Sequence, residues 1–460
     1  MFFKDEYYFL SNMKDLKQEI VYNDLKGNNV EALYQASKLL KDEHRQIVCA
    51  MSGYEAKKAS RRYPVDSDAI SNKDKIMKDL LDIKFDIPLM SNLLLSTLSE
   101  VIVEDNEWHD YYWGRHGGVG ANKLGIMLED KRAELDKIAE VKRKMYIGNL
   151  YNKDIITMYD YVGFTANNCL NTKGELVMGK GNALLVKKLY PSLPKLLANQ
   201  VTKDYNLIFQ DNIFALQTKY HYRDGGDYDL IKAGIDKLIT IANDNNDKLY
   251  ALPVPGIGNG GLELSKVLML MTELPSNVHV WKYPEHFKYT GVGSRRVTEE
   301  IMSLATNKAL ELSEWFVSRS GDADGIDTAI RNGSGDKIEA YIPWENFNKS
   351  KSKLFKQIVI TKVFAKLNHV AWEYLTPPVK KLMSRNVLQV MGEDVNELSD
   401  FEMCYTPDGC NHWNTRDNKK NGTGGTGLAI SLASKLGVPV YNIANKEDLA
   451  RIELIIKSLK

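Results

Sequence analysis

The chain contains few cysteines, almost no net charge and no long apolar run. Its four cysteines are scattered among 460 residues, which excludes a disulfide scaffold and favours a reducing compartment. With 61 basic and 60 acidic residues the net charge is +1, whereas a protein that permanently coats nucleic acid has a clear basic surplus. No apolar stretch approaches the ~20 residues of a membrane helix, and the first residues lack the basic segment of a signal peptide. We therefore expect a soluble, cytoplasmic protein that makes no membrane contact.

The sequence also has little metal-binding character. Cys404, Cys410 and His412 lie near one another, but five residues separate the two cysteines and a fourth ligand is missing. We predict no metal and no cofactor.

Patterning divides the chain into three parts, 1–143, 144–284 and 285–460, as its length allows at ~100–200 residues per domain. The first part has an aromatic, strand-like start followed by helical stretches at Val30–Leu40, Ser71–Phe85 and Pro88–Glu100, which predicts a mainly helical α+β domain. The other two alternate short apolar runs with amphipathic stretches, which predicts two α/β domains. In a doubly wound sheet such as the third part, ligands bind beyond the carboxyl ends of strands.

The segment GELVMGKG, residues 174–181, has seven positions of a phosphate-binding P-loop but ends in glycine where Ser or Thr should hold Mg²⁺. Gly179 and Gly181 would let the backbone approach a phosphate, and the helix that starts there aims its N–H groups at the anion. The preceding Asn168 and Asn171 suit hydrogen bonds to a ribose or a base edge. The segment therefore predicts diphosphate binding without Mg²⁺.

The stretches TANNCLNTKGELVMGKGNALLVKKLYP and LPVPGIGNGGLEL together resemble the macrodomain family, which binds ADP-ribose. The resemblance implies a ligand site made by Asn168, Asn171, Gly179, Lys180, Gly181, Gly258, Asn259, Gly260 and Gly261. The MGKG form with KK and YP looks like the subgroup that strips ADP-ribose from DNA or acidic side chains, including DarG-type antitoxins. In that subgroup a lysine after the loop is catalytic, and Lys187 is the best match here, with Lys188 as the alternate. An ordinary surface lysine is the other interpretation.

The motifs YYFLSN, VEALYQASK, EAKKASRR and WGRHGGVGANKLGIMLEDKR resemble the NADAR family of N-glycosidases. Its functional positions carry over to Glu31, Lys57, Arg61, Trp113 and Asn122, and Asp110 is a second acid close to the tryptophan. Ala32 stands where the family usually has histidine.

These residue types suit cleavage of a nucleobase–ribose bond, because the sugar becomes positively charged in the transition state. A carboxylate such as Glu31 stabilises that charge or activates water. Lys57 and Arg61 can hold a diphosphate, and Trp113 can form a wall against a base or ribose.

The motifs TGVGSR, RSGDADGID, YIPW and GGTGLAI resemble the SLOG superfamily of Rossmann-like nucleotide binders. The resemblance implies a site for an NAD-derived nucleotide formed by Gly293, Ser294, Arg295, Arg319, Gly321, Gly424, Gly425 and Thr426. A scaffold used only for assembly is the alternative.

All three resemblances converge on ADP-ribose or NAD-derived nucleotides. We expect an ADP-ribosyl glycohydrolase that removes ADP-ribose from nucleobases, with DNA as the expected carrier, reversing a DarT-type modification in a phage counter-defence setting. Two alternatives stay open: sequestration or degradation of NAD-derived signalling nucleotides, and salvage of NAD or riboflavin intermediates.

Overall fold

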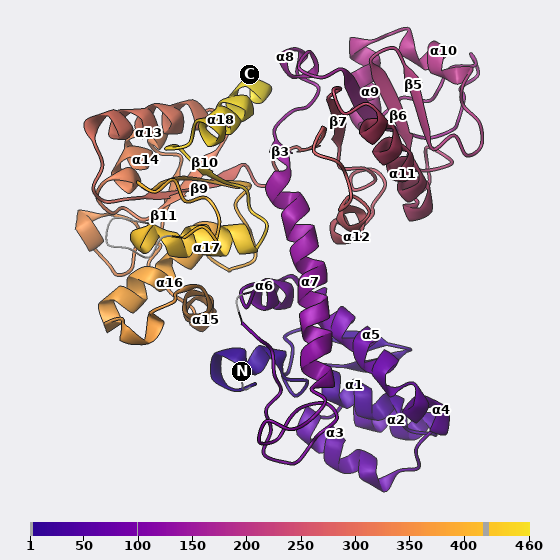
Figure 1. Ribbon diagram of the computed structural model, residues 1–460, viewed down its shortest axis with the longest axis vertical. Helices are drawn as coiled ribbons and strands as arrows, with labels where there is room; N and C mark the ends of the chain where they lie inside the picture. The colour runs from indigo at the N-terminus through magenta and orange to yellow at the C-terminus, as the bar shows by residue number, and fades with distance from the viewer. Residues whose placement is uncertain (1–2, 99, 417–422) are drawn as a thin grey trace. The chain divides into compact units, whose positions relative to one another are not determined.

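The computed structural model describes residues 3–98, 100–416 and 423–460. It divides into two compact units, one made of Met1–Asp136 with Ile358–Ser384 and the other of Lys137–Gln357 with Arg385–Lys460. The protein is therefore multidomain, with a helical N-terminal region and two further sheets (Figure 1). In the described part of the chain, no helix is long and apolar enough to cross a membrane.

The first unit is built mainly from helices. Its elements from the N-terminal segment are η1 (Asp5–Leu10), β1 (Ile20–Tyr22), β2 (Leu25–Gly27), α1 (Val30–Ser37), α2 (Asp42–Cys49), α3 (Gly53–Ala59), η2 (Ser60–Arg62), α4 (Ser67–Ser71), α5 (Lys73–Phe85) and α6 (Pro88–Leu95). Helix α7 (Lys123–Lys144) continues from this unit into the second.

The strand-like start predicted for this unit is wrong. Asp5–Leu10 is a 3-10 helix in which the adjacent Phe9 and Leu10 are both buried. Neighbouring residues of a half-buried strand would point to opposite faces. Tight helical winding is therefore what brings both side chains into the core.

Residues 358–384 belong to the first unit although they lie far along the chain. They hold α15 (Val359–Asn368), η4 (Trp372–Tyr374) and the start of α16 (Pro377–Met391). Lys366 of α15 forms ion pairs with Glu6 at 2.9 Å and with Glu373 at 2.6 Å. The third predicted part is thus interrupted by a helical segment that packs elsewhere.

The first sheet of the second unit has six strands in the order β3-β8-β7-β4-β6-β5. The strands are β3 (Tyr146–Ile147), β4 (Tyr161–Ala166), β5 (Leu207–Gln210), β6 (Ile213–Gln217), β7 (Tyr250–Pro253) and β8 (Val278–Lys282). All neighbours are parallel except β5 and β6. The accompanying helices are α8 (Lys153–Ile156), α9 (Gly181–Leu189), α10 (Leu193–Ala198), α11 (Tyr228–Asp244) and α12 (Leu264–Met269).

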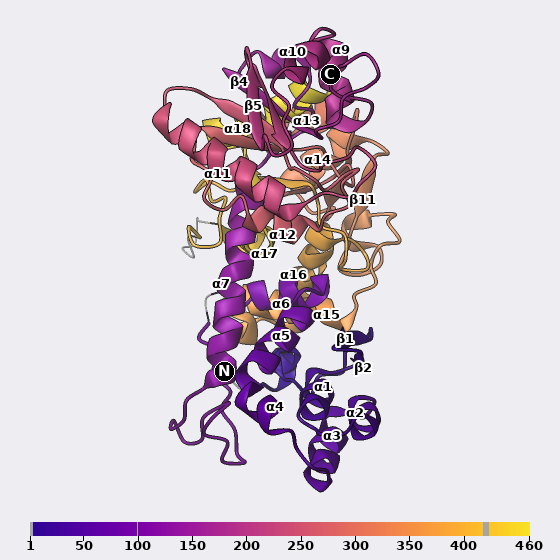
Figure 2. The same cartoon turned by 90° about the vertical axis from the view of Figure 1, so that its right-hand side faces the viewer.

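Helices cover both faces of this sheet. One buried cluster joins β4 to α9 and α10, and the other joins β6 and β7 to α11 and α12 (Figures 1 and 2). This layering matches the predicted alternation of strands and helices, and it leaves the carboxyl end of β4 next to the start of α9.

The second sheet is five-stranded, fully parallel and ordered β11-β10-β9-β12-β13. Its strands are β9 (Lys288–Gly293), β10 (Val317–Ser320), β11 (Ile338–Ala340), β12 (Phe401–Tyr405) and β13 (Val440–Asn442). Its helices are α13 (Glu299–Leu312), α14 (Ile326–Ser334), η3 (Phe347–Lys349), α16, η5 (Gly424–Thr426), α17 (Gly427–Lys435) and α18 (Lys446–Leu459).

The chain reverses its direction of winding between β9 and β12. Helices α13, α14 and α18 pack on one face of the sheet, and α16 and α17 lie on the other (Figure 1). A reversal of strand order opens a crevice at the carboxyl ends of the two strands. The predicted glycine loops follow β9 and β10 at this edge.

Candidate functional site

Helix α1 fixes the carboxylate of Glu31 inside the first unit. The helix begins at Val30 because the Asn29 side chain accepts a hydrogen bond from the Ala32 amide at 2.8 Å. Glu31 is 7% exposed, and its Oε1 accepts a hydrogen bond from Gln35 Nε2 at 2.7 Å. Ser60 in turn donates to Gln35 Oε1 at 3.0 Å. This chain of hydrogen bonds holds a buried acceptor in one orientation.

Trp113 lies against the same helix. Its ring meets the Tyr34 ring edge to face, with 5.7 Å between centroids. Asp110 Oδ1 accepts hydrogen bonds from the amides of Tyr112 at 3.0 Å and Trp113 at 2.9 Å. Asp110 therefore holds the turn that presents the tryptophan, with one carboxylate oxygen engaged in that task.

Asn122 also acts within the protein. It is buried, has a left-handed backbone with φ +49°, and accepts a hydrogen bond from the Glu104 amide at 3.0 Å. Its Nδ2 donates to the Ile102 carbonyl at 3.0 Å. We assign Asn122 to positioning the segment 102–104, because its amide is already bonded to that backbone.

Sequence reasoning missed two titratable groups of this site, Glu104 and Lys38. Burial, with the charges of Asp110 and Glu31, raises the pKa of Glu104 to about 7, against the opposing effect of Lys57. Burial lowers the pKa of Lys38 to about 8, although Glu31 opposes the change.

The position of each missed group explains why it was or was not detectable. Lys38 lies two turns after Glu31, a spacing that puts both on one side of the segment and could have revealed it. Its Nζ lies 4.2 Å from the centre of the Tyr34 ring. No local signal separates Glu104 from the neighbouring Asp105, because its burial depends on tertiary packing.

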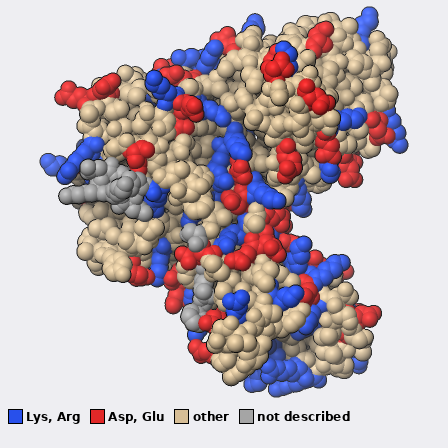
Figure 3. Space-filling model, in the orientation of Figure 1, with Lys and Arg blue, Asp and Glu red and all other residues tan. Residues whose placement is uncertain are grey.

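A basic rim adjoins the site. Lys57 and Lys58 are in the last turn of α3, and Arg61 and Arg62 follow in η2. Figure 3 shows basic side chains gathered over this end of the unit. The described ion pairs of the chain include none of the four, and Lys57 Nζ lies 5.6 Å from the ring centre of Trp108. The rim is thus available to an anionic partner.

The second site is a pocket of about 680 Å³ where β4 ends and α9 begins. Predicted residues that line it are Gly179, Lys180, Gly181, Gly258, Asn259 and Gly260. Gly181 has a left-handed backbone with φ +59°, and a Cβ there would lie 3.1 Å from Asn259 Nδ2. The two glycine loops therefore meet across one pocket, and their close approach uses the absence of a side chain.

Four other predicted residues of this domain do not line the pocket. Asn168 donates to the Lys203 carbonyl at 2.9 Å, and Asn171 accepts the Lys173 amide at 2.8 Å in a turn. Gly261 follows the lining segment with φ +66°. Lys187 is in the last turn of α9, whereas the pocket lies at the first turn.

Other polar residues take part in the pocket instead. Asn167 and Asn182 line it, and Asn182 Oδ1 accepts a hydrogen bond from Thr165 Oγ1 at 2.8 Å. Lys219 also lines it and donates to the Asp224 carbonyl at 2.7 Å and to the Asn259 carbonyl at 3.1 Å. Lys219 therefore ties two loops together and adds positive charge.

Glycine loops also meet at the edge of the second sheet. Gly293 is the last residue of β9, and Ser294 and Arg295 follow it. A Cβ on Gly325 of the next loop would lie 2.3 Å from the Ser294 carbonyl oxygen. At the start of α17, the Gly425 carbonyl accepts a hydrogen bond from Asn386 at 3.4 Å. The remaining predicted residues Gly424 and Thr426 belong to the same short helix, η5.

Gly321 is required by a buried arginine that the sequence did not reveal. A Cβ at Gly321 would lie 1.2 Å from Nη1 of Arg385, which is 4% exposed. Arg385 Nη1 lies 3.6 Å from Asp327 Oδ2, and burial raises the pKa of Asp327. Gly321 therefore makes room for a buried ion pair.

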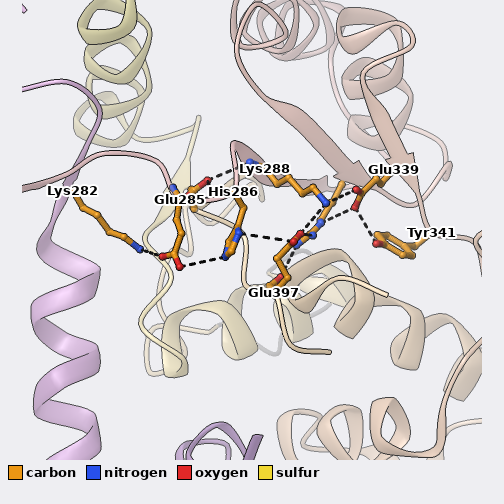
Figure 4. A network of polar contacts seen from close by, with 9 residues as sticks. Lys282, Glu285, His286, Lys288, Glu339, Tyr341 and Glu397 are labelled. Carbon is orange, nitrogen blue, oxygen red and sulfur yellow. Dashed lines mark hydrogen bonds and ion pairs between the residues drawn. The ribbon is translucent and has the colours of Figure 1, made fainter. Parts of the chain in front are cut away.

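Arg319, predicted to clamp a phosphate, is instead part of a buried ionic network. The side chain is 1% exposed and donates to Glu339 Oε2 at 2.9 Å and to the Glu397 carbonyl at 2.7 Å. It also pairs with the Glu397 carboxylate, and Lys288 bridges the same two glutamates at 2.7 and 2.8 Å (Figure 4). Its donors are already occupied by two carboxylates and a backbone carbonyl, so we do not assign Arg319 to a ligand.

The N-terminal residues 1–136 match the NADAR domain family. N-glycosidase YbiA of Shigella boydii is 33% identical over 115 residues, which are 23% of this chain and 68% of that protein. N-glycosidase YbiA of Escherichia coli is 32% identical with the same coverage. Through this domain, the chain belongs to the NADAR family.

Solved structures that resemble part of the chain include macrodomains and YbiA. The macrodomain of Mycobacterium tuberculosis DarG is 28% identical, with 31% of this chain and 99% of that chain covered and a TM-score of 0.24. Escherichia coli YbiA is 29% identical, with 29% and 83% covered and a TM-score of 0.27. The macrodomain of Thermus aquaticus DarG is 26% identical, with 31% and 97% covered and a TM-score of 0.26.

Proposed function

We propose that the N-terminal unit is an N-glycosidase that releases ADP-ribose from a modified nucleobase, with DNA as the carrier. Family membership supports the reaction type, since the curated relatives are named N-glycosidases. The observation that carries the proposal is the buried carboxylate of Glu31, held by Gln35 on the helix that packs against Trp113.

Cleavage of the glycosidic bond is faster when a fixed negative charge lies beside the sugar. As the glycosidic bond breaks, positive charge develops on the ribose, and an oriented carboxylate stabilises it without reorganising. Glu31 would play this part, with Trp113 as a wall for the base or ribose. The positive charges of Lys38 and Lys57 would attract and partly neutralise the diphosphate. None of these steps uses the histidine that Ala32 replaces.

The basic rim of the unit favours a substrate in which the modified base is part of a nucleic acid. Lys58, Arg61 and Arg62 supply positive charge for backbone phosphates. Trp108 is 57% exposed and Tyr54 is 75% exposed, and exposed aromatic rings beside basic side chains stack on unpaired bases.

The glycine-lined pocket would bind ADP-ribose as a macrodomain does. The first turn of α9 offers backbone N–H groups to a diphosphate, and Lys180 and Lys219 add positive charge. The domain would then be a product reader, or a second hydrolase if Lys187 reaches the distal ribose. The second sheet would be a SLOG-type domain that binds an NAD-derived nucleotide near Arg295.

A direct assay tests the proposal. The full chain is incubated with oligonucleotides carrying ADP-ribose on thymidine or on guanosine, and free ADP-ribose is measured. Glu31→Gln should abolish release. Glu43→Gln is the matched control, because Glu43 occupies the first turn of the neighbouring helix α2 but is exposed. Lys187→Ala reports separately on the second domain. If wild type releases nothing but binds a nucleotide tightly, sequestration is the function.

A further inference from the structure

Glu104 presents an unused carboxyl to the N-terminal site. Its backbone is held at both ends, since its amide donates to Asn122 and its carbonyl accepts from the Arg115 amide at 2.8 Å. Its Oε2 is buried and has no hydrogen-bond partner among the described residues. A buried polar atom without a partner is costly, so it points to a role outside folding.

The absence of a side chain at Gly114 leaves room for Glu104 and its carboxyl. A Cβ at Gly114 would lie 2.3 Å from the Glu104 carbonyl oxygen and 3.0 Å from Oε2. Any larger residue would clash with the Glu104 backbone and crowd its carboxyl. Because Gly114 directly follows Trp113, the packing that brings Glu104 in also sets it next to the proposed wall of the site.

The surroundings of Glu104 favour its protonated form. Two carboxylates act on it, Asp110 from its own loop and Glu31 from α1, while Lys57 of α3 opposes them. Burial is the main cause that raises the pKa of Glu104 to about 7, and the two negative charges add to it. A carboxyl group that keeps its proton near neutral pH is suited to act as a general acid.

We propose that Glu104 donates the proton that the departing nucleobase needs, while Glu31 serves as the base on the sugar side. This inference rests on the proposed function. Water attacks the anomeric carbon and gives a proton to Glu31. The carbon–nitrogen bond breaks with its electron pair on the base nitrogen, which takes the proton of Glu104. Exchange with solvent then restores both carboxyl groups, so the reaction is hydrolysis with no other reactant.

The test compares pH profiles of the full chain on ADP-ribosylated oligonucleotide. In wild type the value of kcat should fall as the pH rises above about 7, because Glu104 loses its proton. Glu104→Gln should lower kcat at pH 6 by about 100-fold or more, leave KM unchanged and remove that fall. Glu104→Asp, which keeps a carboxyl, should recover part of kcat. Asp105→Asn is the neighbouring control and should match wild type.

The outcomes separate the two claims. If wild type releases no ADP-ribose at any pH, the proposed function is refuted and this inference falls with it. If wild type is active and Glu104→Gln keeps both its rate and its pH profile, only the role of Glu104 is refuted. If Glu104→Gln and Glu104→Asp lose activity equally while both unfold at the wild-type temperature, a carboxyl at this position does not restore the rate and the inference is overturned.

Discussion

Replacing Gly181 by alanine tests whether the glycine pocket binds ADP-ribose. The residue has φ +59° at the first turn of α9, and an added Cβ would meet Asn259 Nδ2 at 3.1 Å. Both residues line the pocket. Gly174→Ala is the matched control, because Gly174 has φ +71° and open space around it but lies outside the lining.

The two variants share one cost and differ in another. A left-handed backbone costs an L-residue about 1–2 kcal/mol, so both should lose about that much free energy of unfolding. In Gly181→Ala the Asn259 side chain must also shift within the pocket. A loss of about 1.4 kcal/mol in binding equals a tenfold weaker affinity. We expect at least about that loss for Gly181→Ala and none for Gly174→Ala.

Isothermal calorimetry with ADP-ribose and urea unfolding measure the two quantities on the same samples. The reasoning is refuted if both variants keep wild-type affinity, or if both lose it to the same extent. The first result would remove Gly181 from the ligand site, and the second would attribute the loss to general destabilisation.

Three further predictions concern a buried ion pair, the basic rim and a buried carboxyl. Gly321→Ala should lower the free energy of unfolding by about 3–5 kcal/mol, because it displaces Arg385 from a buried ion pair. In an Arg385→Ala background the same change should cost under about 1 kcal/mol. Urea unfolding measures both values, and additive effects of the two substitutions would contradict this prediction. Replacing Arg61 and Arg62 by glutamine should weaken the binding of an unmodified single strand. The slope of log affinity against log salt concentration should become shallower by about 1.4, because two phosphate contacts are lost at ~0.7 each. Fluorescence anisotropy measures this slope, and an unchanged slope would exclude the rim. Burial raises the pKa of Glu402 well above its ordinary range, so the folded protein keeps a proton on this carboxyl that the unfolded chain loses above about pH 4.5. The free energy of unfolding therefore falls as the pH rises past about 4.5. Glu402→Gln should raise the melting temperature more at pH 8 than at pH 5.

Local patterning was sufficient for the two sheets but not for residues 358–384. Short apolar runs bounded by turns predicted the strands β4, β7, β9 and β12, since a buried strand needs such a run whatever it packs against. The segment that holds α15 packs with the first unit through Lys366 and Glu6, which are 360 residues apart. No periodicity within a helix encodes a partner at that distance.

The site residues divide in the same way. The glycines that line the pocket could be selected from the sequence because a close approach of two backbone segments favours glycine, and that preference appears in the local sequence. Arg319 has the same local appearance as a phosphate clamp, but Glu397, 78 residues further along, occupies its guanidinium. The raised pKa of Glu104 depends on burial and on charges from α1 and α3 as well as from its own loop, so it had no local signal either.

The two candidate sites differ in the carboxyl groups they contain, and that difference leads us to assign binding to one proposed site and hydrolysis to the other. The described residues that line the glycine pocket include amides, hydroxyls and the cations Lys180, Lys219 and Arg223, but no carboxylate. Such a lining suits retention of an anionic nucleotide and offers no carboxyl for proton transfer. The N-terminal unit has a held carboxylate, Glu31, and a carboxyl whose pKa lies near neutrality, Glu104. On this reasoning, Glu31→Gln should stop release of ADP-ribose without weakening its binding to the chain, whereas Gly181→Ala should weaken binding without stopping release.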